Sequence, residues 1–311
     1  MNTEEFQQNR ANMIRTLEEK RQRYFRIYTM GIPMSFAASA AIAALNMNGN
    51  PFPWPIVTFI TLAITIIGFQ VVNFIYRKQT KKAFLEGIAE SLGLSYHPNG
   101  AFPLEDVASH KIIPPFDRGL LEDGFTGTVS GISIAFQEAH LVDVTPAQKR
   151  EDPDREDTVF WGIMIRIGIG KNLDAHTVVI PRNALQKFFY TTLSKFKKVN
   201  LVSPKFEERF DVMGTDQVEA RYVLDPAFIE RFMEAGDSLG TKWIEASFKG
   251  REIFLAVNHN RPMFEIGMLW KPLNEDSLGA VTKDIQTILD LIAVLKLNPH
   301  TGLGAELPKR T

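Results

Sequence analysis

Three charged residues in the second half of the chain are the strongest candidates for ligand binding. Asp216, Glu219 and Arg221 lie within six positions, in a link between a predicted strand and a predicted helix. An arginine beside carboxylates makes charge-assisted hydrogen bonds that hold a loop in one conformation. We therefore expect these residues to fix the link, and the alternative is a pocket for an anionic or polar ligand.

The residue types that bind metals are present but poorly grouped. The chain has six histidines and no cysteine, which excludes disulfides, thiolate metal sites and a cysteine nucleophile. Glu138, His140 and Asp143 are close in sequence, but on a strand Asp143 points away from the other two. We expect an exposed strand face there, and neither a metal site nor a cofactor.

A glycine-rich segment resembles a phosphate-binding loop only superficially. Gly168–Lys171 contains two glycines and a lysine, but Ile165 replaces the first glycine of a P-loop and Asn172 replaces its final hydroxyl residue. A hairpin turn after a hydrophobic strand accounts for these glycines instead.

Other signatures of catalysis or nucleic-acid binding are missing from the sequence. There is no Gly-x-Ser-x-Gly nucleophile elbow, and the carboxylates cannot be paired from sequence alone. The net charge of −1 gives no general electrostatic reason to bind nucleic acid. We therefore predict a protein that is not an enzyme.

A long segment without charge places the protein at a membrane. Residues 27–76 contain no Asp, Glu, Lys, Arg or His, although charged residues make up 23% of the chain. Two apolar runs, Ile27–Asn46 and Trp54–Tyr76, flank the turn-rich residues 47–53. Because roughly 20 apolar residues suffice for a helix to cross a bilayer, we predict a transmembrane hairpin, with the lipid bilayer as a partner.

Flanking positive charge predicts the orientation of this hairpin. The cations before the first span are Arg10, Arg15, Lys20, Arg21, Arg23 and Arg26. Those after the second span are Arg77, Lys78, Lys81 and Lys82. Since cytoplasmic flanks carry the excess of Lys and Arg, we predict a multi-pass protein of the bacterial inner membrane with both termini cytoplasmic. The second group of cations should contact the anionic inner leaflet.

Small residues recur every fourth position in the first span, at Gly31, Ser35, Ser39 and Ala43. Such a stripe lets another helix approach closely. We expect it to pack the hairpin on itself, with the hydroxyls of Thr58, Thr61 and Thr65 in the second span placed to bond across to Ser35 or Ser39. The alternative is self-association into a homo-oligomer.

The remaining segments alternate irregularly between helix and strand patterns. Helices are predicted at 3–26, 81–92, 183–197, 225–236 and 278–297. Strands are predicted at 125–144, 159–169, 177–180, 206–213, 222–224, 243–248, 252–257 and 263–266, with a tight hairpin at Lys249-Gly250. This grouping favours an α+β fold with mainly antiparallel pairing, in one continuous sheet covered by helices on one side. Two smaller sheets divided near residues 200–204 are the alternative.

These patterns predict four parts of the chain. An amphipathic cytosolic helix occupies residues 1–26, and the transmembrane hairpin occupies residues 27–76. A cytosolic α+β domain follows at 77–297, with a sub-boundary near 200–204 as an option, and a loose tail occupies 298–311.

One stretch resembles a known bacterial family. Phe206–Val212, Asp216 and Glu219–Pro226 carry the pattern F-E-x-x-F-x-V, then D, then E-A-R-x-x-L-x-P. This pattern is similar to the family called domain of unknown function 3137, with a likeness extending from Lys81 to Leu297. The resemblance implies a membrane-anchored protein with a cytosolic domain, and it supplies neither an activity nor catalytic residues.

Three hypotheses for function follow. The first is a membrane-anchored cytosolic interaction or scaffold module with a protein partner. The second is a domain that senses lipid or a small ligand at the inner membrane, using the basic segment at Arg77–Lys82. The third is a hydrolase whose site assembles only in three dimensions, around His140, His176 or His259 with carboxylates.

Overall fold

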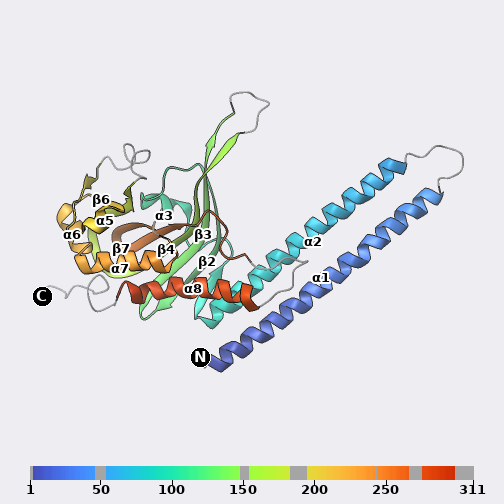
Figure 1. Ribbon diagram of the computed structural model, residues 1–311, viewed down its shortest axis with the longest axis horizontal. Coiled ribbons are helices and arrows are strands. Elements are labelled where there is room, and N and C mark those ends of the chain that lie inside the picture. The colour runs from blue at the N-terminus through green and yellow to red at the C-terminus, as the bar shows by residue number, and fades with distance from the viewer. Residues whose placement is uncertain are drawn as a thin grey trace. The chain divides into compact units, whose positions relative to one another are not determined.

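The computed structural model (Figure 1) describes residues 3–45, 54–147, 154–182, 195–241, 244–265 and 275–297. The chain divides into two compact units. The first contains residues 1–88 and 265–280, and the second contains residues 89–264 and 281–311. Each unit is described separately below.

The first unit is built on two long helices, α1 (Thr3–Leu45) and α2 (Trp54–Ser91). The rings of Tyr24 and Tyr76 lie 5.9 Å apart, and Ser35 Oγ lies 3.3 Å from Thr65 Oγ1. As the residue number rises along α1 it falls along α2, so the helices run antiparallel. The predicted hydroxyl contact between the two spans is therefore present at Ser35.

Both helices continue beyond the predicted spans. Helix α1 passes through residues 26 and 27 without a break, and α2 continues through the basic segment to Ser91. Among the described residues one helical stretch, Phe59–Ser91, is apolar and long enough to cross a membrane. The two-span prediction thus finds a match at α2, whereas part of the first predicted span lies outside the described residues.

The second unit contains one antiparallel sheet. Its strands are β1 (Leu94–His97), β2 (Arg118–Val129), β3 (Ile132–Thr145), β4 (Arg155–Pro181), β5 (Lys197–Lys198), β6 (Phe210–Gly214) and β7 (Ile244–Asn258). Their order is β1-β2-β3-β4-β6-β5, and β7 also pairs with β4. Because β4 pairs with strands from both sides of residues 200–204, the sheet is continuous, as we preferred, and is not divided there.

Two predicted hairpin turns are wrong for one shared reason. Strand β4 continues through Gly168 and Gly170, and β7 continues through Lys249 and Gly250. The ladder between β4 and β7 shifts register on both sides of the Leu173–Gly250 pair, and Gly250 has a φ of 58°. A bulge needs the same conformational freedom of glycine as a tight turn, so the local sequence does not distinguish them.

Helices cover both faces of the sheet, whereas we expected them on one. Helix α3 (Leu104–Ser109) buries Val107 in a cluster with Val178, Ile180 and Phe254. Helix α7 (Pro226–Ser238) packs on the opposite face, where the rings of Phe228 and Phe248 lie 5.7 Å apart. Helix α8 (Glu275–Val294) buries Val281, Ile285, Ile288 and Ile292 at helical spacing.

The segment around the family motif is more helical than predicted. Residues 204–207 form the short helix α5 (Pro204–Glu207), so β6 begins later than expected. The predicted strand at 222–224 is instead the end of helix α6 (Gln217–Val223), because Asp216 caps that helix. No strand forms at 263–265. The predicted helix 183–197 lies largely outside the described residues, as does the tail 298–311.

A buried aromatic cluster should dominate the stability of the second unit. Phe232 is fully buried, with its ring 5.7 Å from that of Phe210. Substituting Phe232→Ala should destabilise the fold by roughly 3–5 kcal/mol, because it removes apolar contacts and leaves a cavity. Urea unfolding of the full chain in detergent, followed by tryptophan fluorescence, measures this change. The exposed substitution Val218→Ala is the control, and an equal effect of both variants would contradict the packing.

Candidate functional site

The two carboxylates of the predicted site hold helix α6 in place. Asp216 Oδ1 accepts hydrogen bonds from the backbone N–H groups of Val218 and Glu219, both at 2.8 Å. The carboxylate of Glu219 accepts from the backbone N–H groups of Asp174 at 3.2 Å and Ala175 at 3.1 Å. One end of α6 is thereby capped, and its side is fixed to strand β4.

Arg221 does not join these carboxylates, which differs from our expectation. Its Nε donates to the backbone carbonyl of Asn200 at 3.3 Å, and its Nη2 donates to Gln217 Oε1 at 3.5 Å. Within the described ranges it forms no ion pair. The guanidinium is therefore positioned by polar contacts while its charge is left unneutralised.

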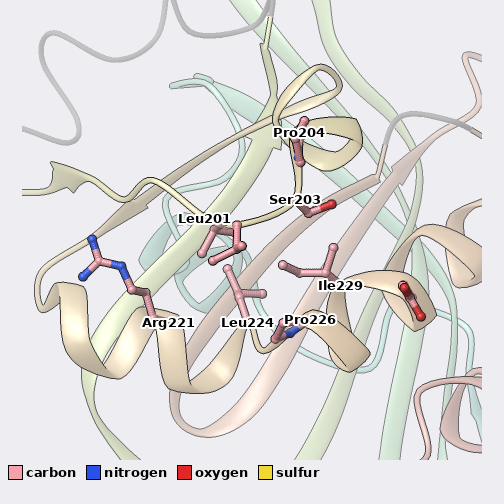
Figure 2. Close-up of a pocket in the computed structure, with 9 residues that line it drawn as sticks. Leu201, Ser203, Pro204, Arg221, Leu224, Pro226 and Ile229 are labelled. Atoms are coloured by element: carbon pink, nitrogen blue, oxygen red, sulfur yellow. The ribbon is translucent and has the colours of Figure 1, made fainter.

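Arg221 lies at one end of a pocket of about 350 Å³ (Figure 2). The lining comes from the loop before α5, the end of α6 and the first turns of α7. The residues are Leu201, Val202, Ser203, Pro204, Arg221, Leu224, Pro226, Ile229 and Glu230. Figure 2 shows the side chains of Leu201, Leu224 and Ile229 converging, with Arg221 to one side.

Two capping interactions hold the walls of this pocket. Asp225 Oδ1 accepts from the backbone N–H of Phe228 at 2.8 Å, which fixes the start of α7. Glu207 Oε1 accepts from the backbone N–H of Leu201 at 2.7 Å, which holds the loop on the other side. The sequence pattern Asp225-Pro226 predicted the first of these, but the role of the loop as a pocket wall was missed.

Exposed apolar side chains occur on the segments that form the pocket, and one of them, Val202, lines it. Val202 is 89% exposed, Val218 is 77% exposed and Tyr222 is 55% exposed; we call these three residues the α6 patch. Lys171 Nζ lies 3.5 Å from the centroid of the Tyr222 ring, which is a cation–π contact. The patch thus combines apolar surface with two cations, Lys171 and Arg221.

A second grouping lies inside the second unit and includes one predicted histidine. Ser247 Oγ is 3.0 Å from His110 Nδ1 and 2.8 Å from His176 Nε2. His110 Nε2 is 3.3 Å from Glu252 Oε1, and the His110 ring stacks on Phe254 with centroids 4.2 Å apart. These four polar residues form a connected group, which we call the buried polar network, between strands β4 and β7 and the end of α3.

The buried polar network has the residue types of a Ser-His-Glu hydrolase, but a substrate cannot reach it. Catalysis requires that the nucleophile reach a substrate carbonyl, and the side chains of Ser247 and His110 are fully buried. The two other histidines of the hydrolase hypothesis do not belong to the buried polar network. His140 stacks on Trp161, and His259 follows the end of β7. The arrangement is suited to fastening strands together rather than to acyl transfer.

The residues considered as a metal site, Glu138, His140 and Asp143, also differ from the expectation. Glu138 is buried, where we expected an exposed strand face, and its carboxylate accepts from the Trp161 indole at 3.3 Å and the Met263 backbone at 3.3 Å. Asp143 is exposed further along β3. Within the described parts of the chain, no group of three or more His, Asp or Glu residues is placed to hold a metal ion.

The basic segment after the second predicted span is partly neutralised within the first unit. Arg77 and Lys81 both pair with Glu265, with the Lys81 Nζ–Glu265 Oε1 distance at 3.2 Å. Burial acts to raise the pKa of Glu265, but the charges and hydrogen bonds of Lys81 and Arg77 lower it below its ordinary value. Lys82 pairs with Glu86 at 3.6 Å, and Lys78 is exposed.

The small-residue stripe of α1 is only partly in contact with α2. Ser35 meets Thr65, as described above. A Cβ atom at Gly31 would meet nothing within 4 Å, so this residue does not lie at a close helix contact. The side chains of Ser39 and Ala43 lie outside the described part of the helix. Close packing of the hairpin along the whole stripe therefore stays a prediction.

Comparison with known proteins supports the predicted family over part of the chain. Residues 158–297 match the model of the family described as "Protein of unknown function (DUF3137)". This range contains α6, the pocket and strand β7, and it begins later than the likeness we predicted from Lys81.

Two further comparisons are less informative. A crystal structure of the mycobacterial trehalose monomycolate transport factor A matches at 12% identity, covering 69% of this chain and 95% of that one, with a TM-score of 0.36. Neither the identity nor the score is high enough to transfer a function. No curated protein matches the chain.

The buried polar network predicts that the fold loses stability in acid. Burial, followed by the charge of Lys249, lowers the pKa of His176 from 6.5 to about 4. The fold therefore disfavours the protonated ring, while the unfolded chain binds the proton near pH 6.5. The contribution of His176 to the free energy of unfolding is fully present above pH 6.5. It is lost as the pH falls toward 4, by roughly 3 kcal/mol in total.

The substitution His176→Gln tests this because glutamine does not titrate. The thermal midpoint of the variant should fall less than that of the unmodified chain between pH 6.5 and 4, whatever its offset at neutral pH. His140→Gln, which lies outside the buried polar network, is the matched control. Parallel curves for the unmodified chain and His176→Gln would rule out this histidine as the source of acid sensitivity.

Proposed function

We propose that this protein is an interaction module anchored in the bacterial inner membrane, with its α+β domain in the cytoplasm. Helices α1 and α2 form the two-span hairpin in this proposal, and both ends of the chain lie on the cytoplasmic side. The observation that carries the proposal is the amount of large apolar surface that the paired helices leave exposed.

The exposed apolar residues lie on both helices. They are Phe25, Ile27, Met30, Met34 and Phe36 on α1, and Ile56, Phe59, Ile60, Leu62, Ile64, Ile66, Ile67, Val71, Phe74 and Ile75 on α2. Contiguous exposed apolar surface of this extent is unfavourable in water, at about 25 cal/mol per Å². Hydrocarbon around both helices removes that cost, which favours two spans.

The pocket and the α6 patch favour an interaction function for the cytoplasmic domain. Exposed apolar side chains beside a pocket are typical of protein-binding surfaces. The residue types closest to a catalytic arrangement, in contrast, are enclosed around Ser247. Binding of a small amphiphile in the pocket is the second candidate, because about 350 Å³ lies within the usual range of ligand sites, roughly 300–1,000 Å³.

Membrane extraction and a reporter fusion test the anchor. The full chain should stay in the membrane pellet after washing with alkaline carbonate and dissolve only in detergent, because hydrocarbon-buried helices are not released by loss of ion pairs. A periplasmic-only reporter such as alkaline phosphatase should be inactive after Thr311 and active within residues 47–53. Activity at Thr311, or release by carbonate, would refute the proposed topology.

Photo-crosslinking tests the interaction surface. A crosslinking amino acid at Val202 in living cells should give a discrete higher-mass product containing one partner, since this side chain is 89% exposed beside the pocket. The same amino acid at Arg155, exposed at the start of β4, is the matched control. Products of equal yield at both positions would show that the α6 patch is not a specific surface.

A further inference from the structure

Arg221 is prepared to bind an anion. Contacts with Asn200 and Gln217 already fix the position of its guanidinium, and in the described part of the chain no carboxylate neutralises it. A guanidinium presents five N–H donors, so donors remain after these two contacts. These contacts restrict the side chain, which reduces the conformational entropy that binding an anion there would cost.

Three nearby carboxylates accept hydrogen bonds from the backbone. Asp216, Glu219 and Glu207 each accept hydrogen bonds from backbone N–H groups at 2.7–3.2 Å. Their oxygens hold the walls and helices of the site, whereas Arg221 and Lys171 present their charge outward. Glu230 is the exposed acid at the α7 end of the pocket. Among the residues that line the pocket, the positive charge is that of Arg221 on α6 and the negative charge is that of Glu230 on α7.

Between these two ends the pocket is aliphatic. Leu224 and Ile229 are buried at its base, and Leu201 and Val202 flank its opening. Val218 and Tyr222 are further exposed apolar side chains on helix α6, which also carries Arg221. A small ligand that fills the pocket would leave these side chains uncovered, whereas a polypeptide segment that also follows α6 would contact them.

We propose that this site binds a peptide segment of a partner protein in which an aliphatic side chain neighbours an aspartate or glutamate. The aliphatic side chain fills the pocket over Leu224 and Ile229, and the carboxylate binds Arg221. Glu230 excludes the reverse orientation, because it would repel the acid at the α7 end. This inference rests on the proposed interaction function and specifies the chemistry of the partner.

A peptide selection with the full chain in detergent micelles tests the proposal. Phage displaying random twelve-residue peptides are enriched on the immobilised protein, and the enriched peptides are resynthesised with blocked termini and fluorescein for anisotropy. We expect enriched sequences to share a Leu, Ile or Val within two positions of an Asp or Glu. Arg221→Gln should weaken their binding by at least about tenfold.

A double-mutant cycle places the carboxylate on Arg221. Changing the peptide acid to its amide should cost a similar factor with the unmodified protein and much less with Arg221→Gln, because both changes remove one interaction. Arg155→Gln is the matched control and should leave binding unchanged. Val202→Asp, an exposed substitution compatible with folding, should also abolish binding by placing a charge beside the pocket.

Several outcomes would overturn the proposal. These are enriched peptides without an acid, losses that simply add in the cycle, octanoate binding in the pocket without any peptide binding, or self-association that Val202→Asp removes. If Val202 crosslinks to a partner in cells while the cycle shows no coupling, the interaction function stands and this inference fails. If the reporter places the domain outside the cytoplasm, the proposed function fails independently of peptide binding.

Discussion

Strand β4 is the constraint on which the second unit depends. Over 27 residues it pairs with β3, β6 and β7, so segments distant in sequence meet on one strand. The ladder between β4 and β7 shifts register between Leu173 and Thr177, and the backbone N–H groups of Asp174 and Ala175 in this interval donate to a side chain. Glu219 accepts from both, and this contact fixes α6 and hence the side of the pocket that carries Arg221.

The same strand pairing determines how polar groups are enclosed. His176 on β4 and Ser247 on β7 lie close in the ladder, and His110 reaches them from the end of α3. Ser247 Oγ contacts one ring nitrogen of each histidine, and these contacts offset part of the cost of burying the groups. Residues that could serve catalysis on an open surface thus hold the strands together here, whereas the pocket beside α6 is accessible from the surface.

The two units separate the protein's physical tasks. The first exposes apolar side chains along α1 and α2, a surface that suits hydrocarbon, and neutralises Arg77 and Lys81 with Glu265. The second encloses apolar residues on both faces of the sheet, and its described residues include few exposed large apolar side chains, among them Leu120 and those of the α6 patch. A protein with one unit for lipid and one for a partner is consistent with this division.

The sequence by itself determined features that depend on local periodicity and on charge. Hydrophobic runs predicted α2, the caps at Asp225-Pro226 predicted α7, and the F-E-x-x-F motif predicted the family. Only the tertiary structure decided that Gly168 and Gly250 form a bulge, that helices cover both faces, and that Arg221 stands apart from Asp216 and Glu219. These outcomes depend on strand partners far away in sequence, and neither local spacing nor residue type carries information about which distant backbone group a side chain will meet.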